Sequence, residues 1–501
     1  MRDEPTRNTG HARRRGVTSA LIAAVSITAA LGLSIYHYIQ FSSRVRALPL
    51  GATVAGIPVG GLSEAQAAEL LEATYLAPID VTYRGHTFQL LPAEAGFELE
   101  MANMLATVRP PESARDGLPQ FWDYLWGRQP TSDRSVSLQA TYSPERLQNF
   151  LEEVSQYYDE PAHSPWADPE QLMTIRGTGG IHLDRDAAAD ALRSALFSRE
   201  ARTATLVGLP GAAAQPTIDL LEQQIRDFLE LQEFDGLFSL YLVDMRTDER
   251  VHMNLWQGQD IATDPDVAYS GMSIMKIYIL TEFYRQLTDG ALPYELDLVE
   301  KSITESSNWT SNLLIEWIGD LDAGSGLYRL NETIAALGLQ GTFIGGLYDT
   351  EEPPGFRYTP SNTREDINTA PDPYMQTTPS DIGRLLEGIY RCAEFGDGLL
   401  IETFGDQFTA QECQDMIGWL TSNRIGVLIE AGVPGGTPVA HKHGWAEGEP
   451  IGDAGIVLTD NGDYVLVYYV WYPEYTYWDE NSSLLADVSR AVYNYINPIT
   501  P

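Results

Sequence analysis

Lysine is scarce in this chain of 501 residues, because only Lys276, Lys301 and Lys442 are lysines among its 32 basic residues. Arginine stays protonated in proteins, whereas a buried lysine can lose its proton and act as a base. A lysine base therefore has few possible positions here. Lys276 and Lys442 both lie in short patterns that are typical of catalytic sites, so the lysines direct the search for function.

Positive charge is scarce as a whole. The chain has 70 acidic residues, a formal net charge of −38 and a pI of about 4.4. Nucleic-acid binding requires clustered Lys and Arg, so we expect no nucleic-acid partner. Hydrophobic residues make up 44% of the sequence, which is enough for well-packed cores, and the length predicts roughly two to four domains.

Cysteine is limited to Cys392 and Cys413, which lie on either side of a loop that contains Gly396 and Gly398. In a cytosolic protein both would be reduced thiols, whereas outside the membrane such a pair can form a disulfide. We expect a disulfide between them. Two unrelated thiols in the core are the alternative.

The long apolar run covers residues 17–39. A helix of this length can span a hydrocarbon core of ~30 Å. Arg13, Arg14 and Arg15 precede the run, and basic flanks stay on the cytoplasmic side. This predicts a cytoplasmic basic tail at 1–16, a transmembrane signal anchor at 17–39, and the rest of the chain outside. A cleavable signal peptide is the alternative, although no convincing cleavage site follows the run.

Residues 50–212 are predicted to form a smaller α+β region with two related halves. This region has no cluster of chemically reactive residues. Ser63 and Gln66 form a predicted capping box before a helix at 64–75. Strands are expected at 79–83 and 87–90, and a helix–strand plan recurs at 143–207. A stalk or spacer is one interpretation of this region. A helical connector is predicted at 217–233.

The same region resembles the peptidoglycan-binding repeats of VanW-type cell-wall proteins. The resemblance rests on Val-Gly-Gly-Leu-Ser at 59–63 with its helix, and on Gly-Ile-His-Leu-Asp at 180–184. It implies contact with peptidoglycan.

Ser273 and Lys276 form a Ser-x-x-Lys pattern at the start of an apolar, and therefore buried, helix. Positions i and i+3 share a helix face, and burial lowers the pKa of a lysine. Lys276 is thus placed to take a proton from Ser273 and make it a nucleophile. A helix-capping serine is the simpler interpretation of this pattern taken alone.

Two further patterns follow. Ser306 and Asn308 precede a predicted helix, so capping is again the simpler interpretation. Lys442 is flanked by His441 and His443 and is followed by Gly444 and strands of an antiparallel sheet. Two histidines spaced in this way suggest a metal site, which we discount because no nearby Cys or carboxylate completes it. We expect neither a metal nor another cofactor.

In this order, the three patterns resemble the Ser-x-x-Lys, Ser-x-Asn and Lys-[Thr/Ser]-Gly motifs of the penicillin-recognising serine enzymes. Residues 236–501 resemble the class A β-lactamase-related serine hydrolases. The resemblance implies a β-lactamase/transpeptidase-like domain, an antiparallel sheet flanked by helices, so the overall fold class is α+β. Its implied catalytic residues are Ser273 as nucleophile, Lys276 as proton acceptor, Ser306 as proton relay, Asn308 as substrate-amide contact and Lys442 as carboxylate contact.

The resemblance also implies substrate contacts at His443, Gly444 and Trp445, with the backbone N–H groups of Ser273 and Trp445 as the oxyanion hole. His443 departs from the family pattern, where Thr or Ser is usual. The Glu-x-x-Leu-Asn loop, whose Glu activates the deacylating water, is missing. Glu365 is the nearest candidate for that base.

The sequence therefore predicts a single-pass bacterial membrane protein whose extracytoplasmic serine hydrolase domain forms an acyl-enzyme. The expected substrate is a β-lactam or a D-Ala-D-Ala-type amide of peptidoglycan. A catalytically impaired wall-binding or sensing protein that keeps the fold is the alternative, favoured by His443 and the missing Glu.

Overall fold

The computed structural model describes residues 12–45, 47–109, 117–127, 134–287, 290–350 and 357–500. These residues divide into two compact units. Unit 1 comprises residues 1–162 and 179–212, and unit 2 comprises residues 163–178 and 213–501. Of the predicted basic tail at 1–16, residues 1–11 lie outside the described residues.

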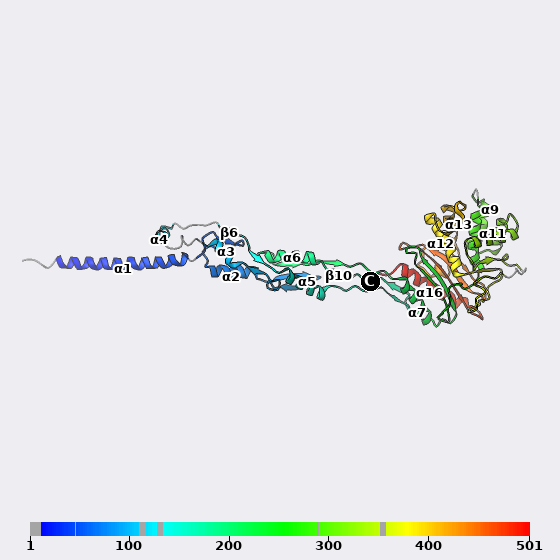
Figure 1. Ribbon diagram of the computed structural model, residues 1–501, viewed down its shortest axis with the longest axis horizontal. Helices are drawn as coiled ribbons and strands as arrows, with labels where there is room; N and C mark the ends of the chain where they lie inside the picture. Colours follow the sequence, from blue (N-terminus) through cyan, green and yellow to red (C-terminus); the bar gives the residue numbers. More distant parts are fainter. Residues whose placement is uncertain are drawn as a thin grey trace, which may run out of the picture. The chain divides into compact units, whose positions relative to one another are not determined.

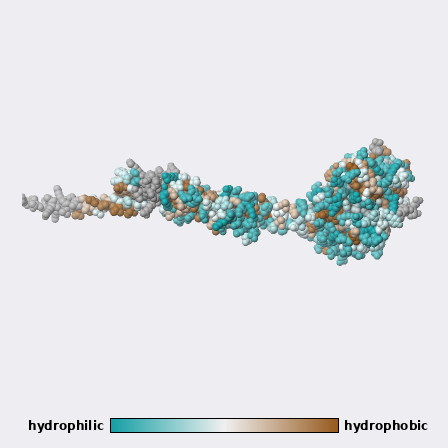
Figure 2. Space-filling view, in the orientation of Figure 1, coloured by the Kyte–Doolittle hydropathy of each residue, from teal (hydrophilic) through white to brown (hydrophobic). Residues whose placement is uncertain are grey.

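Unit 1 begins with a long helix, and among the described residues this helix alone is long and apolar enough to cross a membrane, over Leu21–Ser42. Its apolar side chains, such as Leu21, Leu31 and Ile39, are exposed, and they form the brown band in Figure 2. The helix contains the predicted 17–39 segment. Both an anchor and a signal peptide fit this observation.

Short helices and strands make up the rest of unit 1. The helices are α1 (Ala12–Val45), α2 (Glu64–Tyr75), α3 (Met101–Val108), α4 (Leu118–Leu125), α5 (Pro144–Tyr158) and α6 (Arg185–Phe197). The strands are β1 (Thr53–Val54), β2 (Ile57–Pro58), β3 (Ile79–Tyr83), β4 (His86–Leu90), β5 (Glu98–Leu99), β6 (Ser135–Val136), β7 (Ala140–Thr141), β10 (Ile181–Leu183), β11 (Thr203–Thr205) and β12 (Gly208–Pro210).

Local signals in the sequence explain much of unit 1. The Ser63 side chain accepts from Gln66 N, and the Gln66 side chain accepts from Ser63 N, which is the predicted capping box. Strands β3 and β4 pair as a hairpin, and β11 adds to β3 in parallel. One core joins them, containing Leu71, Val81 and Leu192 among others.

Unit 2 is built on a six-stranded antiparallel sheet in the order β15-β14-β13-β21-β20-β19. Its strands are β13 (Leu237–Asp244), β14 (Arg250–Trp256), β15 (Gln259–Asp260), β19 (Val439–Gly444), β20 (Ile451–Val457) and β21 (Tyr464–Trp471). A separate small sheet contains β16 (Tyr269–Ser270), β17 (Phe343–Ile344) and β18 (Met375–Thr377).

Helices cover both faces of the large sheet (Figure 1). On one face lie α7 (Ile218–Leu231) and α16 (Trp478–Ile496), in a core with Leu240 and Leu466. The other face packs against α12 (Pro379–Phe395) and a larger helical core. That core also involves α8 (Lys276–Gln286), α9 (Pro293–Thr304), α10 (Asn308–Ile318), α11 (Ala323–Ala336), α13 (Leu399–Phe404) and α14 (Ala410–Thr421). The short α15 (Ile429–Gly432) lies beside α16. The predicted α+β fold class is confirmed.

A hairpin from the middle of the chain belongs to unit 2. Strands β8 (Trp166–Asp168) and β9 (Met173–Ile175) pair with each other, and Ile175 forms a bridge with Ile499 near the C-terminus. Asn494 Nδ2 also donates to Leu172 O at 2.6 Å. The predicted region 50–212 therefore contributes residues to both units. Its extent as a functional domain stays a prediction, as do the other predicted boundaries.

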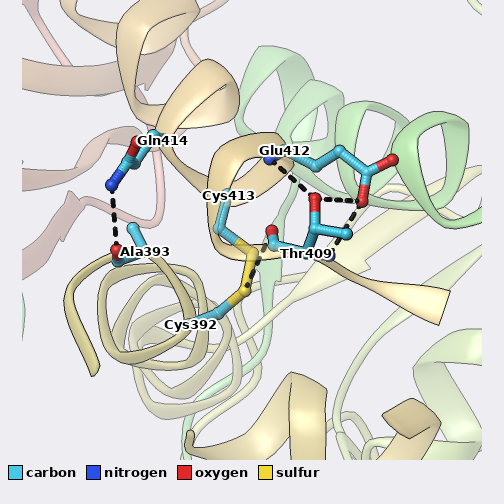
Figure 3. Close-up of a disulfide and its surroundings, with 6 residues drawn as sticks. All are labelled: Cys392, Ala393, Thr409, Glu412, Cys413 and Gln414. Carbon is cyan, nitrogen blue, oxygen red and sulfur yellow. Dashed lines mark hydrogen bonds between the residues drawn. A yellow bond between two sulfur atoms is a disulfide. The ribbon is translucent and has the colours of Figure 1, made fainter. Parts of the chain in front are cut away.

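The predicted disulfide between Cys392 and Cys413 is present and joins α12 to α14, with Cα atoms 5.9 Å apart (Figure 3). Thr409 caps α14, since its hydroxyl accepts from Glu412 N at 3.2 Å. Gln414 Nε2 donates to Ala393 O at 3.2 Å beside the bridge. The two helices are thus held together by a covalent bond and a side-chain hydrogen bond.

Candidate active site

The Ser273–Lys276 pair lies at a helix start in unit 2. Ser273 is in a 3₁₀ turn, Met272–Met275, and Lys276 is the first residue of α8. Lys276 Nζ lies 2.7 Å from Ser273 Oγ. The lysine is buried, whereas the serine is partly exposed. Helical spacing therefore places a shielded amine against a reachable hydroxyl.

Electrostatics favour a neutral Lys276. Burial, followed by the positive charge of Lys442, holds the pKa of Lys276 well below its ordinary value, and the charge of Asp349 opposes this shift. Desolvation disfavours the charged form of any amine. A neutral lysine is the form that can accept a proton from Ser273.

Ser306 and Asn308 converge on the same pair from the turn between α9 and α10. Ser306 Oγ donates to Ser273 Oγ at 2.9 Å, and Lys276 Nζ donates to Asn308 Oδ1 at 2.8 Å. Ser306 has a φ of +57°, a left-handed backbone that non-glycine residues seldom adopt. Ser307 caps α10 by accepting from Thr310 N at 3.3 Å. Because Ser307 caps the helix, the Ser306 hydroxyl contacts Ser273 instead.

Lys442 and His443 lie on β19, the edge strand of the sheet. Lys442 is buried, and burial lowers its pKa to about 8, with the charge of Asp453 acting in the other direction. Its Nζ approaches His443 O at 3.5 Å. Within the described chain, no hydrogen bond links Lys442 Nζ to Ser273 or Ser306. Its charge reaches the site through space, since it lowers the pKa of Lys276.

His443 is a neutral imidazole at neutral pH. Burial, followed by the charge of Lys442, lowers the pKa of His443 to about 4. Its Nδ1 is buried and has no hydrogen-bond partner among the described residues. A neutral imidazole carries one N–H donor and one acceptor. The residue can therefore still donate one hydrogen bond, as a Thr or Ser hydroxyl would.

Hydrogen-bonding partners hold the buried His441 ring in place. Its Nδ1 lies 2.8 Å from Asp453 Oδ2, and its Nε2 lies 3.2 Å from Asn423 Nδ2. Burial works against the charged ring, but the Asp453 carboxylate outweighs it and raises the pKa of His441. Both ring nitrogens are thus occupied by protein partners next to Lys442.

Gly444 brings β19 against the nucleophile turn. A Cβ at Gly444 would lie 3.3 Å from side-chain atoms of Ile274 and Met272, the two neighbours of Ser273. A Cβ there would require these side chains to shift, so glycine favours the close approach. Trp445 follows with 48% of its surface exposed. The oxyanion hole assigned to the N–H groups of Ser273 and Trp445 stays a prediction.

Two residues that the sequence did not single out complete the site. The Tyr348 ring centre lies 4.3 Å from Lys276 Nζ, and its hydroxyl donates to Met272 O at 3.0 Å. Asn308 Nδ2 donates to Asp349 Oδ2 at 3.0 Å. The side-chain amide of Asn308 therefore links the Asp349 carboxylate to the Lys276 amine. No motif signals this pair, because it lies in a loop 41 residues beyond Asn308.

Glu365, the predicted deacylation base, is exposed to solvent. Its neighbours Arg364 and Asp366 pair with each other. Among the described residues, no hydrogen bond joins Glu365 to Ser273, Lys276 or Asn308. Its role stays a prediction, and Asp349 is the carboxylate that the structure brings to the site.

Comparison with known proteins gives a family for part of unit 2. Residues 293–496 match the model of the Beta-lactamase enzyme family. The match confirms the predicted β-lactamase-like domain for this stretch, which includes Ser306, Asn308 and Lys442. Ser273 and Lys276 precede the matched stretch. No curated protein matches the chain.

Solved structures similar to the chain include PBP-A, at 22% identity and a TM-score of 0.39, covering 56% of this chain and 96% of that one. A PBP-A mutant solved as its acyl-enzyme complex with penicillin G has 21% identity and a TM-score of 0.38, covering 56% and 97%. An ancestral class A β-lactamase of Gram-negative bacteria has 20% identity and a TM-score of 0.39, covering 55% and 98%.

Proposed function

We propose that unit 2 is a serine acyl-transfer enzyme that attacks an amide bond in a β-lactam or a D-Ala-D-Ala-type peptide. One observation carries the proposal: Ser273 Oγ lies within 3 Å of both a buried amine, Lys276 Nζ at 2.7 Å, and a second hydroxyl, Ser306 Oγ at 2.9 Å. A nucleophile beside its base, with the base oriented by a third group, is the general arrangement of nucleophilic catalysis. Asn308 is that third group here.

Acylation uses these four side chains. Neutral Lys276 accepts the Ser273 proton as Oγ attacks the carbonyl carbon of the amide. The C–N bond then breaks, and the proton returns from Lys276 through the Ser306 hydroxyl to the leaving nitrogen. Ser273 ends as an ester, and Lys276 is neutral again. Asn308 Oδ1, 2.8 Å from Nζ, keeps the amine aimed throughout.

Substrate binding is assigned to β19. Lys442 lies buried beside the site, so its positive charge attracts a carboxylate in a medium where charges interact strongly. His443 supplies a neutral donor next to it. The backbone N–H groups of Ser273 and Trp445 are proposed to hold the carbonyl oxygen. Such donors are typically worth ~10²–10³ in rate each.

Release of the acyl group is assigned to Asp349. In this step a water adds to the ester carbonyl and its proton passes to the Asp349 carboxylate. The acyl C–O bond to Ser273 then breaks, the carboxylic acid is released, and the proton on Asp349 returns to Ser273 Oγ. The hydrogen bond from Asn308 to Asp349 supports this role, because it places the carboxylate beside the amide that contacts Lys276. Glu365 is the other candidate that the sequence supplies.

The proposed location of the protein in the cell rests on the remaining parts of the chain. We assign α1 to a single-pass anchor in a bacterial membrane, with the residues after α1 on the outer side and peptidoglycan as the natural surrounding. Residues 50–212 are proposed to contact peptidoglycan, on the resemblance of their sequence to wall-binding repeats. The disulfide supports an oxidising compartment.

A non-catalytic wall-binding or sensing protein is the second candidate. The observation that favours it is His443 in the position of a hydroxyl residue, together with the solvent-exposed Glu365. The close packing of Ser273, Lys276, Ser306 and Asn308 favours the enzyme, because a binder has no need for a buried lysine against a serine.

Labelling with a fluorescent penicillin separates the two candidates. The full chain in detergent, its Ser273→Ala variant and a Ser325→Ala control are incubated with the probe and resolved on a denaturing gel. The proposal predicts covalent labelling of the wild type and the control but not of Ser273→Ala. A wild type that is folded and unlabelled contradicts acylation by β-lactams and leaves the binder.

A further inference from the structure

An exposed aromatic surface adjoins the candidate nucleophile. Residues 471–478 read Trp-Tyr-Pro-Glu-Tyr-Thr-Tyr-Trp. Tyr475 and Tyr477 are 37% and 57% exposed, and Trp445, from the loop after β19, is 48% exposed. Large exposed rings gathered on one surface mark binding sites more often than chance. We call these three exposed rings and the partly buried Trp478, which packs against the core of unit 2, the aromatic platform.

The platform consists of two ring pairs that a hydrogen bond connects. Trp445 and Trp478 meet edge to face with centroids 5.2 Å apart, and Tyr475 and Tyr477 lie 4.6 Å apart. Tyr475 Oη donates to Glu447 Oε1 at 3.2 Å, which ties the tyrosine pair to the loop that carries Trp445. The four rings therefore come from the loop after β19, the loop after β21 and the first residue of α16, and Glu447 connects the two pairs.

The two loops are fixed to each other by their backbones. Gly448 and Thr476 form an antiparallel bridge, and Thr476 Oγ1, which is buried, accepts from Tyr472 N at 3.2 Å. A Cβ at Gly448, whose φ is +77°, would lie 3.0 Å from the Tyr475 ring, so both the backbone conformation and the close contact favour glycine there. Rings held in advance lose little entropy when they bind a ligand.

The platform is next to the nucleophile. Trp445 directly follows Gly444, which packs against Met272 and Ile274 on either side of Ser273. Ser270 Oγ, three residues before Ser273, also donates to Glu449 Oε2 at 3.1 Å, so the platform loop contacts the nucleophile segment twice. A ligand on the platform thus has its neighbouring groups within reach of Ser273.

Charge narrows the class of ligand. Residues 445–489 contain no Lys or Arg, and Glu447, Glu449 and Glu474 lie on the two platform loops. Such a surface repels anions. A neutral ring with an apolar face and many hydroxyls fits it, because the face stacks on Trp and Tyr while the carboxylates accept from the hydroxyls. Three rings that are each more than a third exposed form an open surface, unlike the closed cage that selects cations.

We propose that the aromatic platform binds a pyranose chain, so that the substrate of unit 2 is a peptide still attached to its glycan. The claim that a glycan binds depends only on the aromatic platform. The claim that this glycan carries the peptide that acylates Ser273 rests on the proposed function. The amide to be attacked reaches Ser273 while the sugar rings stack on Trp445, Tyr475 and Tyr477.

The test is titration calorimetry of the full chain in detergent with a soluble tetramer of N-acetylglucosamine. We expect Tyr477→Ala to weaken binding at the platform at least tenfold and Tyr475→Ala/Tyr477→Ala to abolish it, whereas any binding by residues 50–212 persists in every variant. Tyr328→Ala on α11, which removes a tyrosine that is 65% exposed in the same unit, leaves binding unchanged. Thermal unfolding of each variant reports that it folds.

Three results would overturn the proposal: no binding by the wild type at millimolar glycan, equal binding by the wild type and the double variant, or binding of a quaternary ammonium ligand with no binding of the glycan. Repeating the titration on Ser273→Ala separates the two proposals, because this variant cannot be acylated. Glycan binding without penicillin labelling of the wild type would leave the platform in place and remove the acyl-transfer function.

Discussion

The ring of Tyr348 lies 4.3 Å from Lys276 Nζ, and its hydroxyl donates to the backbone of Met272 in the nucleophile turn. The tyrosine thus shields the amine from water on one side and holds the turn beside it. Because desolvation is the main cause of the lowered Lys276 pKa, we expect the exclusion of water by the ring to outweigh its attraction for a cation and to help keep this lysine neutral.

Tyr348→Ala should raise the Lys276 pKa, because water gains access to the amine. The acid limb of the acylation rate against pH should move up by about one pH unit, with a roughly tenfold slower reaction at any pH on that limb. Tyr348→Phe keeps the ring and serves as the control. The acid limb of its acylation rate should lie at nearly the same pH as that of the wild type. Stopped-flow measurement of penicillin labelling across pH tests this, and an unmoved limb in Tyr348→Ala would refute it.

The wild-type acylation rate should have a bell-shaped dependence on pH. It rises as Lys276 loses its proton, below the ordinary range for lysine, because the base must be neutral. It falls as Lys442, with its pKa of about 8, loses the charge that binds the substrate carboxylate. Lys442→Arg should remove the alkaline limb, because arginine stays charged. An alkaline limb that persists in Lys442→Arg would show that another group causes it.

Asp349→Asn should separate acylation from release. Labelling should remain within a few-fold of the wild type, while hydrolysis of the adduct slows about a hundredfold or more, since general base catalysis contributes typically 10²–10⁴. Glu365→Gln is the matched control and should release the acyl group at the wild-type rate. Decay of the label after removal of free penicillin gives both rates. The reverse pattern, slow release in Glu365→Gln alone, would assign the base to Glu365.

Removing the disulfide should lower stability without abolishing labelling. Cys392 and Cys413 are 21 residues apart, and closing such a loop in the unfolded chain is worth about 3 kcal/mol. Cys392→Ser/Cys413→Ser should therefore unfold at a lower temperature, although Gln414 still bonds Ala393 across the same helices. Calorimetry of both proteins under oxidising conditions measures the difference. Equal melting temperatures would show that the bridge does not stabilise unit 2.

Features encoded by neighbouring residues could be predicted from the sequence. The capping box of Ser63 and Gln66 and the spacing of Ser273 and Lys276 each depend on residues three apart, and both patterns lie on helix starts as expected. Lys301, the third lysine, proves to be a surface residue paired with Asp297 at 2.7 Å. The scarcity of lysine therefore pointed to the two buried ones.

Features that depend on distant contacts were missed. Strand β9 lies within the predicted helix–strand plan at 143–207 and pairs with β8, but its Ile175 also forms a bridge with Ile499 near the C-terminus, so its place in unit 2 has no local signal. Asp349 likewise joins the site through Asn308, and its loop carries no motif. Glu365 was chosen by its order in the sequence, which says nothing about whether its side chain faces the site.

The most direct test of the central claim is mass spectrometry of the full chain after reaction with penicillin G and proteolysis. Formation of an acyl-enzyme predicts the mass of one intact penicillin added to the peptide that contains Ser273, and no adduct in Ser273→Ala. No adduct in the folded wild type, or an adduct on a different residue that persists in Ser273→Ala, would contradict the assignment of Ser273 as the nucleophile.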